Sequence, residues 1–336
     1  MMKLWSRLKN NLDGYTAALL GTVLLATVLP VQGRGYEAAS LVSKLVVALL
    51  FFLHGVKLSP QNLWAGLTHW RLHLVITSAT FIMFPLLGLI LKLPLTHLVG
   101  DNLYLGIMFI CVLPSTVQSS IAFTSMAGGN VAAAVCAASA SSLLGVAVTP
   151  LLAGLLLGTA SGGFSSQAVI DLCWQLLFPF VLGQALRFKL ISPLNRHRSL
   201  VGYVDRLSVL FIVYVSFSHG TTSGLWSTLS WPLFLALVLA CGLLLALALF
   251  LSARAGRLFG FDRADRIVVL FCGSKKSLVT GVPMANIIFP VDLASTIILP
   301  LMVFHQMQLM ACAWIARRLA RQGQEKHADT PSSSSI

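Results

Sequence analysis

Long apolar stretches alternate with short polar segments along most of the chain. A membrane-spanning helix needs roughly 20 mainly apolar residues, and most of these stretches have that length. The pattern predicts ten spans, at 15–31, 38–56, 72–93, 103–126, 131–158, 167–187, 204–220, 231–253, 265–289 and 292–316, of which the first and seventh are short. The chain is therefore expected to be an all-α polytopic membrane protein.

Composition supports this interpretation. Of the 336 residues, 57% are hydrophobic and only 10% are charged, whereas charged residues make up about 25% of an ordinary soluble domain. The cysteines lie within predicted spans without the spacing of metal ligands, so no disulfide framework or metal site is expected. Residues 322–336 are polar and rich in Ser, which predicts a disordered tail.

The basic residues are distributed by loop, and this explains the net charge of +13. If the N-terminus lies inside, the outer loops hold only Arg34 and Lys92, with Lys44 just within the second span, while nearly all other Lys and Arg residues fall on the inner side. This positive-inside bias predicts an inner-membrane protein with both termini in the cytoplasm. The positive charge thus indicates contact with the lipid bilayer and no nucleic acid, and nothing in the sequence requires a protein partner.

A faint internal repeat divides the chain. "FFLHGVKLSPQNLWAGLTHW" (51–70) is similar to "VSFSHGTTSGLWSTLSW" (215–231), and residues 111–130 are similar to residues 272–290. These pairs fall at corresponding spans of two five-span halves, and halves with an odd number of spans must be inverted relative to one another. The expected units are residues 1–158, residues 159–321 and the tail at 322–336.

Polar and small residues interrupt spans four and nine at mid-depth. The first interruption contains Pro114, Gln118, Ser119 and Ser120, and the second contains Gly273, Ser274, Lys275, Lys276 and Ser277. Pro114 removes a backbone donor and Gly273 weakens a helix, so both spans are predicted to break into half-helices there. Non-helical backbone at this depth survives only within protein or beside a water-filled cavity, which indicates a central binding site.

These residues resemble the bile acid:sodium symporter family. The resemblance extends from "LLFFLHGVKLS" through "LPSTVQSSIAFTSMAGGNVAAAV" to "FCGSKKSLVTGVPMANIIF". It is closest to a divergent branch whose ninth helix has Lys-Ser-Leu followed by Gly-x-Pro-Met. The resemblance implies ten helices in two inverted five-helix repeats, with broken helices four and nine crossing at the centre.

The resemblance also implies positions for sodium ligands. Sodium-coupled members use a Ser-Asn pair on helix four, hydroxyls on helix five, a Gln on helix three, and Glu and Gln on helix nine. Here these positions correspond to Ser119 and Ser120, to Ser139, Ser141 and Ser142 within one residue, to Thr80, and to Cys272 and Lys276. No Asp or Glu lies in the middle of a span, and a hard cation benefits from a carboxylate. The sequence therefore predicts only a vestigial sodium site near Ser119, Ser120 and Ser139, and no cofactor.

Two adjacent lysines in an apolar span require an explanation, because each costs roughly 2.5 to 3.5 kcal/mol at the centre of an inserted helix. Our hypothesis is that the Lys276 ammonium takes the place of a sodium ion and tethers helix four through Gln118, Ser119 and Ser120. Its charge would be permanent, or would titrate and couple transport to protons. Lys275 would face the cavity or its inner mouth. The alternative is that one lysine extends to the membrane interface.

Smaller polar groups mark the last span. His305 and Gln308 lie on one helical face, where they form interhelical hydrogen bonds or line a substrate cavity. The lysines and the start of the second half of helix nine would together favour an anion.

We therefore expect an alternating-access secondary transporter of an amphipathic organic anion, such as a conjugated steroid or another carboxylate or sulfate. A core of spans three to five and eight to ten would move against a panel of spans one, two, six and seven. The alternative is a regulatory or lipid-handling membrane protein that keeps the fold without transporting. No HExxH motif or paired mid-span carboxylates support an enzyme, and no charged ring supports a channel.

Overall fold

The computed structural model describes residues 14–57, 69–157 and 166–328, and every regular element within these ranges is a helix. The first stretch of helices comprises α2 (Gly14–Val28), α3 (Gly33–Lys57), α5 (Trp70–Ser78), the π-helix η1 (Ala79–Met83), α6 (Phe84–Ile90), α7 (Lys92–Val99), α8 (Asp101–Val112), α9 (Gln118–Met126) and α10 (Val131–Leu157). The second comprises α11 (Ser166–Ala185), α12 (Arg187–Arg196), α13 (Arg198–Thr222), α14 (Leu225–Thr228), α15 (Trp231–Leu258), α16 (Arg263–Ser274), α17 (Leu278–Ile288) and α18 (Val291–Ala328).

Several helices have the length and hydropathy of membrane spans. Seven pass this test among the described residues, and an eighth is added if the bent pair formed by the end of α11 and by α12 counts as one span. Two shorter apolar helices, Ala17–Val28 and Asp101–Val112, lie where the first and fourth spans were predicted. The protein is therefore a polytopic membrane protein, and the count of ten spans stays a prediction.

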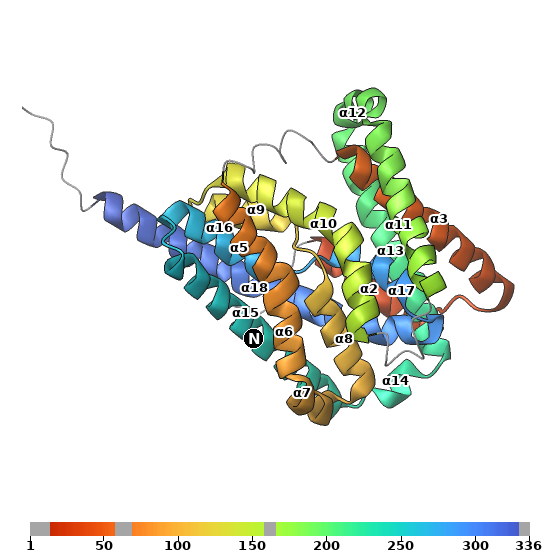
Figure 1. Ribbon diagram of the computed structural model, residues 1–336. Coiled ribbons are helices and arrows are strands. Elements are labelled where there is room, and N and C mark those ends of the chain that lie inside the picture. The colour runs from red at the N-terminus through yellow and green to blue at the C-terminus, as the bar shows by residue number, and fades with distance from the viewer. Residues whose placement is uncertain (1–13, 58–68, 158–165, 329–336) are drawn as a thin grey trace, which may run out of the picture.

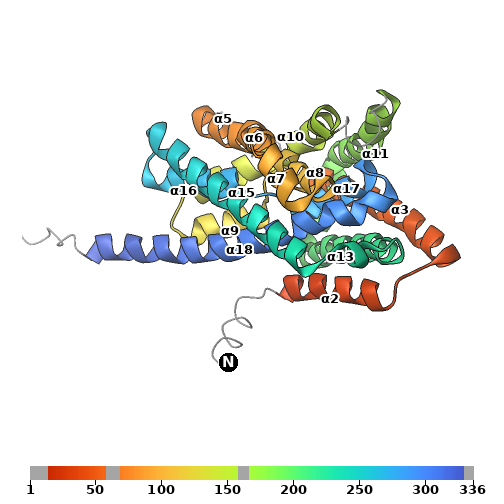
Figure 2. The ribbon, with the colours of Figure 1, turned by 90° about the horizontal axis from the view of Figure 1, so that it is seen from below.

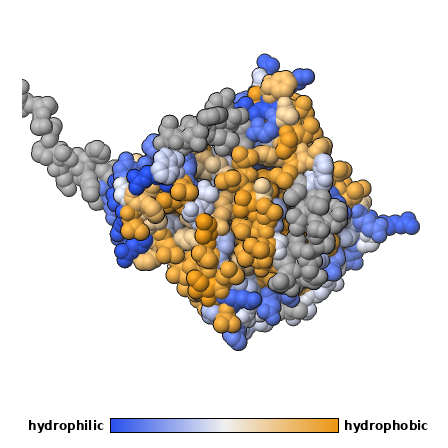
Figure 3. All heavy atoms as spheres, in the orientation of Figure 1, coloured by the Kyte–Doolittle hydropathy of each residue, from blue (hydrophilic) through white to orange (hydrophobic). Residues whose placement is uncertain are grey.

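Apolar side chains cover much of the outer surface, as a bilayer requires. On the face in Figure 3 they form a broad continuous area, and hydrophilic side chains gather toward its ends. Around the whole molecule, exposed leucines on α2, α6, α11 and α15, such as Leu24, Leu86, Leu182 and Leu239, belong to the apolar outer surface.

The predicted breaks are present, with one shift in position. Residues 113–117, which include Pro114, separate α8 from α9, and residues 275–277 separate α16 from α17. Gly273, which we expected to start the second break, instead lies within α16 and is fully enclosed. A Cβ there would lie 3.3 Å from Cβ of Ala79 and 3.2 Å from Oγ of Ser252. This glycine therefore permits close helix packing, and the helix ends at the next residue, Ser274.

The half-helices lie inside the bundle, and long helices surround them (Figures 1 and 2). α18 packs along α8, α13, α15 and α17, and α13 packs against α2, α3 and α17. α3 and α11 form another close pair on one side of the molecule. α18 continues to Ala328, so residues 322–328 of the tail that we predicted as disordered are helical, while residues 329–336 lie outside the described part of the chain.

Candidate functional site

The two breaks meet, and their exposed backbone groups bond to one another. The Ser277 N–H donates to the Pro114 carbonyl at 3.0 Å. In the other direction, Ser115 Oγ donates to the Cys272 carbonyl at 2.7 Å. A buried backbone polar group without a partner is costly, so these contacts explain how two non-helical segments survive in an apolar interior.

Helix α10 supplies further partners for the first break. Ser141 Oγ accepts the N–H of Ser115 at 3.0 Å, and Thr149 Oγ1 donates to the Val112 carbonyl at 2.8 Å. Ser141, predicted as a candidate ion ligand, thus holds the broken backbone of span four.

The ammonium group of Lys276 lies in a cage of backbone carbonyls. Its Nζ donates to the carbonyls of Thr80 at 2.8 Å, Cys111 at 2.9 Å and Leu113 at 2.7 Å. An ammonium group has three N–H donors, so all of them are used. Nζ also lies 4.1 Å from the centre of the Phe84 ring, a cation–π contact. Lys276 is 0% exposed.

The local sequence explains why these carbonyls are available. In η1 the Phe84 N–H bonds back to the carbonyl of Ala79. The next acceptor in this π-helical register is the carbonyl of Thr80, and its donor would be residue 85, a proline without an N–H. Cys111 and Leu113 lie at the C-terminal end of α8. Carbonyl groups there have no partner within the helix, and they carry the partial negative charge of the helix dipole.

Gln308 of α18 holds the backbone of the same lysine. Its Oε1 accepts the N–H of Lys276 at 2.9 Å, and its Nε2 donates to the Lys276 carbonyl at 2.7 Å. The same Nε2 lies 3.0 Å from Nδ1 of His305. Gln308 therefore fixes the unwound segment, which is the interhelical hydrogen bonding that we considered for this pair, and His305 also borders the cavity described below.

Lys275 is also 0% exposed but has fewer partners. Its Nζ donates to Ser119 Oγ at 2.6 Å and lies 4.3 Å from the centre of the Phe123 ring. Ser119 Oγ donates in turn to Thr116 Oγ1 at 3.0 Å, which lies 2.8 Å from Ser120 Oγ. The ammonium thus begins a chain of hydroxyl groups on span four.

Our hypothesis for the lysines was wrong about their partners. Lys275 contacts Ser119, whereas Lys276 contacts backbone carbonyls and none of Gln118, Ser119 and Ser120. The reason is that Lys275 has extended backbone angles, φ −108° and ψ 149°, and successive side chains of an extended segment point to opposite sides. Burial of both groups also excludes the alternative that either extends to the membrane interface, and Lys275 does not face the cavity.

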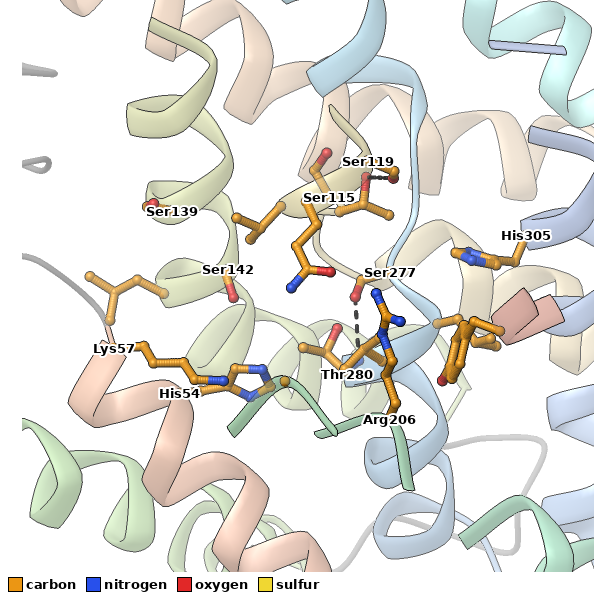
Figure 4. Close-up of a pocket in the computed structure, with 18 of the residues that line it drawn as sticks. His54, Lys57, Ser115, Ser119, Ser139, Ser142, Arg206, Ser277, Thr280 and His305 are labelled. Carbon is orange, nitrogen blue, oxygen red and sulfur yellow. Dashed lines mark hydrogen bonds between the residues drawn. The ribbon is translucent and has the colours of Figure 1, made fainter. Parts of the chain in front are cut away.

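A cavity of about 300 Å³ lies beside the place where the two breaks meet, which we call the crossing (Figure 4). It is bordered by both breaks, by α10 through Ser139 and Ser142, and by α2, α3, α11, α13 and α18. Ser142 faces it from α10, and Ser277 and Thr280 face it from the start of α17. Tyr15, Leu143, Phe180, Val279 and Leu309 provide apolar surface.

The charged side chains around this cavity are basic. Lys57 and Arg206 lie at its border with His54 and His305, and no acidic side chain is among the described residues that line it. The first residues of α9 and α17 also border it, and the N-terminus of a helix carries partial positive charge and backbone N–H donors. The arrangement favours an anion.

The structure thus brings most of the predicted site residues together. Gln118, Ser119, Ser139, Ser277 and His305 line the cavity; Lys275, Lys276, Thr80, Ser120, Cys272 and Gln308 lie in the crossing behind it. Ser274 Oγ bonds to the carbonyl of Leu270 in its own helix and takes no part.

Sequence reasoning missed several residues. Thr280 follows the N-cap Ser277 by three positions, a spacing that could have placed it at the start of a half-helix. Arg206 and Lys57 were assigned to inner loops, and only the tertiary structure places them at a cavity.

Comparison with known proteins identifies relatives over nearly the full chain. "Uncharacterized protein PA2026" of Pseudomonas aeruginosa is 52% identical over 92% of this chain and 93% of its own. "Putative symporter YfeH" of Escherichia coli is 44% identical over 96% of this chain and 97% of its own. Sodium/bile acid cotransporter 7 of Rattus norvegicus is 30% identical over 87% of this chain and 86% of its own. The model of the SBF-like CPA transporter family matches residues 13–321, which confirms the resemblance noted in the sequence: the chain belongs to this family.

Proposed function

We propose that the protein is a secondary transporter that carries an amphipathic organic anion across the cytoplasmic membrane by alternating access. The family and the names of its relatives support transport. The observation that carries the choice of substrate is the cavity, where two half-helix N-termini and basic side chains converge without an acidic lining residue among those described.

Thr280 supports the location of the anionic group. Its side chain lines the cavity and is 5% exposed, and its Oγ1 is buried without a hydrogen-bond partner. A buried hydroxyl without a partner costs free energy that a ligand acceptor would recover. The Thr280 N–H donates to Ser277 Oγ at 3.3 Å, whereas the N–H groups of Leu278 and Val279 precede the first hydrogen bond of α17 and have no acceptor within the helix. These two N–H groups and Thr280 Oγ1 form a set of donors for a carboxylate or sulfate.

The rest of the cavity suits the apolar body of such a molecule. Leu143, Phe180 and Leu309 lie on its walls, and a volume of about 300 Å³ is at the lower end of ligand pockets. A substrate with one anionic end and an apolar scaffold would use both parts.

The finer architecture is also part of the proposal. Ten spans would form two inverted repeats, residues 1–158 and 159–321, with both termini in the cytoplasm. The helix breaks at residues 113–117 and 275–277 fall at corresponding places in the two halves and support this arrangement. Spans three to five and eight to ten would move against spans one, two, six and seven.

For coupling, we propose that the Lys276 ammonium replaces a transported sodium ion. It donates hydrogen bonds to three carbonyl oxygens of the kind that coordinate a hard cation. Ser119, at a predicted sodium-ligand position, bonds to a second ammonium at 2.6 Å, and a cation there would be repelled. Transport would then be sodium-independent, either as uniport or coupled to protons.

This proposal predicts that sodium does not stabilise the purified protein. Apparent unfolding temperature is measured across a sodium titration at constant ionic strength, with potassium or choline as replacement. A ligand at 100 times its Kd stabilises the folded state by about 2.7 kcal/mol, so binding would be visible. We expect equal unfolding temperatures in all three salts. A saturable rise that only sodium produces would contradict the replacement.

The transport proposal is tested by flux into liposomes. Purified protein should accelerate uptake of a subset of radiolabelled amphipathic carboxylates and sulfates, with a Thr280→Val variant for comparison. Valine keeps the shape and removes the hydroxyl, so we expect an affinity at least about tenfold lower, since one lost hydrogen bond to a charged group is worth about 1.5 to 3 kcal/mol. Ser274→Ala, away from the cavity, should transport normally. Absence of flux for every anion would favour a regulatory or lipid-handling role.

A further inference from the structure

The cavity opens to the outside of the molecule where its lining residues are exposed and ends where they are buried, and α13 contributes Gly202 and Arg206 to the lining. At the open end the side chains of Lys57, Gln118 and Arg206 are exposed. At the other end Ser277 and Thr280 are buried, at 7% and 5% exposure. Arg206 is in the first half of α13, so this half of the helix lies at the mouth.

The second half of α13 packs against α17 and the start of α18. Ser216 Oγ donates to Asn286 Oδ1 at 2.7 Å, and His219 Nε2 lies 3.5 Å from Asp292 Oδ1. Asn286 lies six residues beyond Thr280 on α17, nearly two helical turns further from the cavity. These contacts therefore lie beyond the buried end of the cavity.

At Gly220, helix α13 lies in close contact with α18. A Cβ at residue 220 would overlap Oγ of Ser295 and lie 2.7 Å from its Cβ. Helix α13 can therefore approach α18 this closely only because residue 220 has no side chain.

The closed contact also contains an unfavourable feature. Ser295 is 1% exposed, and its Oγ has no hydrogen-bond partner. Separation of α13 from α18 would give this hydroxyl access to water, which reduces the cost of opening.

From this geometry we infer that the transporter has a gate on the side opposite the mouth. The gate is the contact of Ser216, His219 and Gly220 on α13 with Asn286, Asp292 and Ser295 on α17 and α18. The inference rests on the proposed function, because a carrier must expose one site to each side of the membrane in turn. The structure has the mouth at Arg206 open and this gate closed. Opening requires the second half of α13 to separate from α17 and α18.

The test measures access to the cavity and does not need the transported anion. A Ser142→Cys variant places a thiol on the cavity wall, and a membrane-impermeant maleimide is added to right-side-out or inside-out vesicles. The protein without this cysteine gives the background. Gly220→Ala is then added to force the gate apart, and Gly220→Ala with Ser295→Gly removes the overlapping atoms and serves as the matched control.

We expect Ser142→Cys alone to react mainly from the side of the mouth. With Gly220→Ala, labelling from the gate side should rise about tenfold, as for a minor conformation that becomes appreciably populated. Ser295→Gly should return it to the starting rate. An unchanged rate in a folded Gly220→Ala protein would overturn the inference.

A second variant covers the case in which Gly220→Ala does not fold. Asn286→Ala adds no atoms and removes the acceptor that Ser216 has on α17, so that only the Ile212 carbonyl of its own helix, at 2.8 Å, is left to it. This variant should also raise labelling from the gate side, and no rise would overturn the inference. Flux by the parent protein separates the two proposals. Normal flux with unaltered labelling refutes the gate alone, whereas altered labelling without any flux refutes only transport.

Discussion

Replacement of Lys276 by alanine is expected to destabilise the protein strongly and to make its stability depend on an added cation. The variant leaves the carbonyls of Thr80, Cys111 and Leu113 without donors in a fully buried position. Each unpaired buried group costs about 1 to 3 kcal/mol, so we expect a loss of unfolding free energy of at least about 3 kcal/mol. The measurement is the apparent unfolding temperature in detergent.

The same variant should be rescued by ammonium, methylammonium or sodium ions, because the space left by the side chain would be lined by carbonyl oxygens and the Phe84 ring. Lys276→Met is the matched control: it removes the charge but fills the space, so it should be destabilised without rescue. Lys44→Ala, at an exposed position, should behave as the parent. A Lys276→Ala protein as stable as the parent in cation-free buffer would show that the cage does not need a cation.

Replacement of Gly55 by alanine is expected to separate α3 from α11. A Cβ there would overlap the Phe180 carbonyl, and reciprocally a Cβ at Gly183 would overlap the carbonyl of Phe52. Backbone cannot rotate away as a side chain can, so the cost should reach the upper end of the range for overpacking, about 3 kcal/mol. We expect the unfolding temperature of either variant to fall by roughly 5 °C or more.

Gly21→Ala provides the comparison for this pair. Gly21 lies within α2, and a Cβ there meets no atom within 4 Å. Alanine favours a helix over glycine by about 1 kcal/mol, so this variant should be neutral or slightly more stable. If Gly55→Ala and Gly183→Ala matched Gly21→Ala, the close approach of α3 and α11 would not contribute to stability.

The roles of the two lysines have a consequence for coupling. Lys276 has carbonyl partners for every N–H, and its backbone is held by Gln308, so it is suited to a constant structural charge. Lys275 has one hydroxyl partner, and that hydroxyl lies on the cavity wall. The two lysines look equivalent in the sequence, but Lys276 is enclosed by carbonyl groups, whereas Lys275 is hydrogen-bonded to Ser119, a residue that lines the cavity.

The sequence by itself determined that the chain lies in a membrane, where most of its helices lie, that spans four and nine are broken, and to which family the chain belongs. These features depend on local composition: apolar length, a proline at residue 114 and polar residues at mid-depth act wherever the segment lies. Pro85 similarly leaves the Thr80 carbonyl without its donor, although this consequence becomes visible only with the π-helical register of η1.

Only the tertiary structure decided which lysine bonds to which partner, that Gly273 packs instead of breaking the helix, and that Arg206 and Thr280 border one cavity. The physical reason is that these properties depend on direction. In the extended segment at residues 275–277, neighbouring side chains point to opposite sides, and the partner of each is set by segments more than a hundred residues away. The sequence gives the type of each side chain, whereas the packing of the helices sets which groups that side chain contacts.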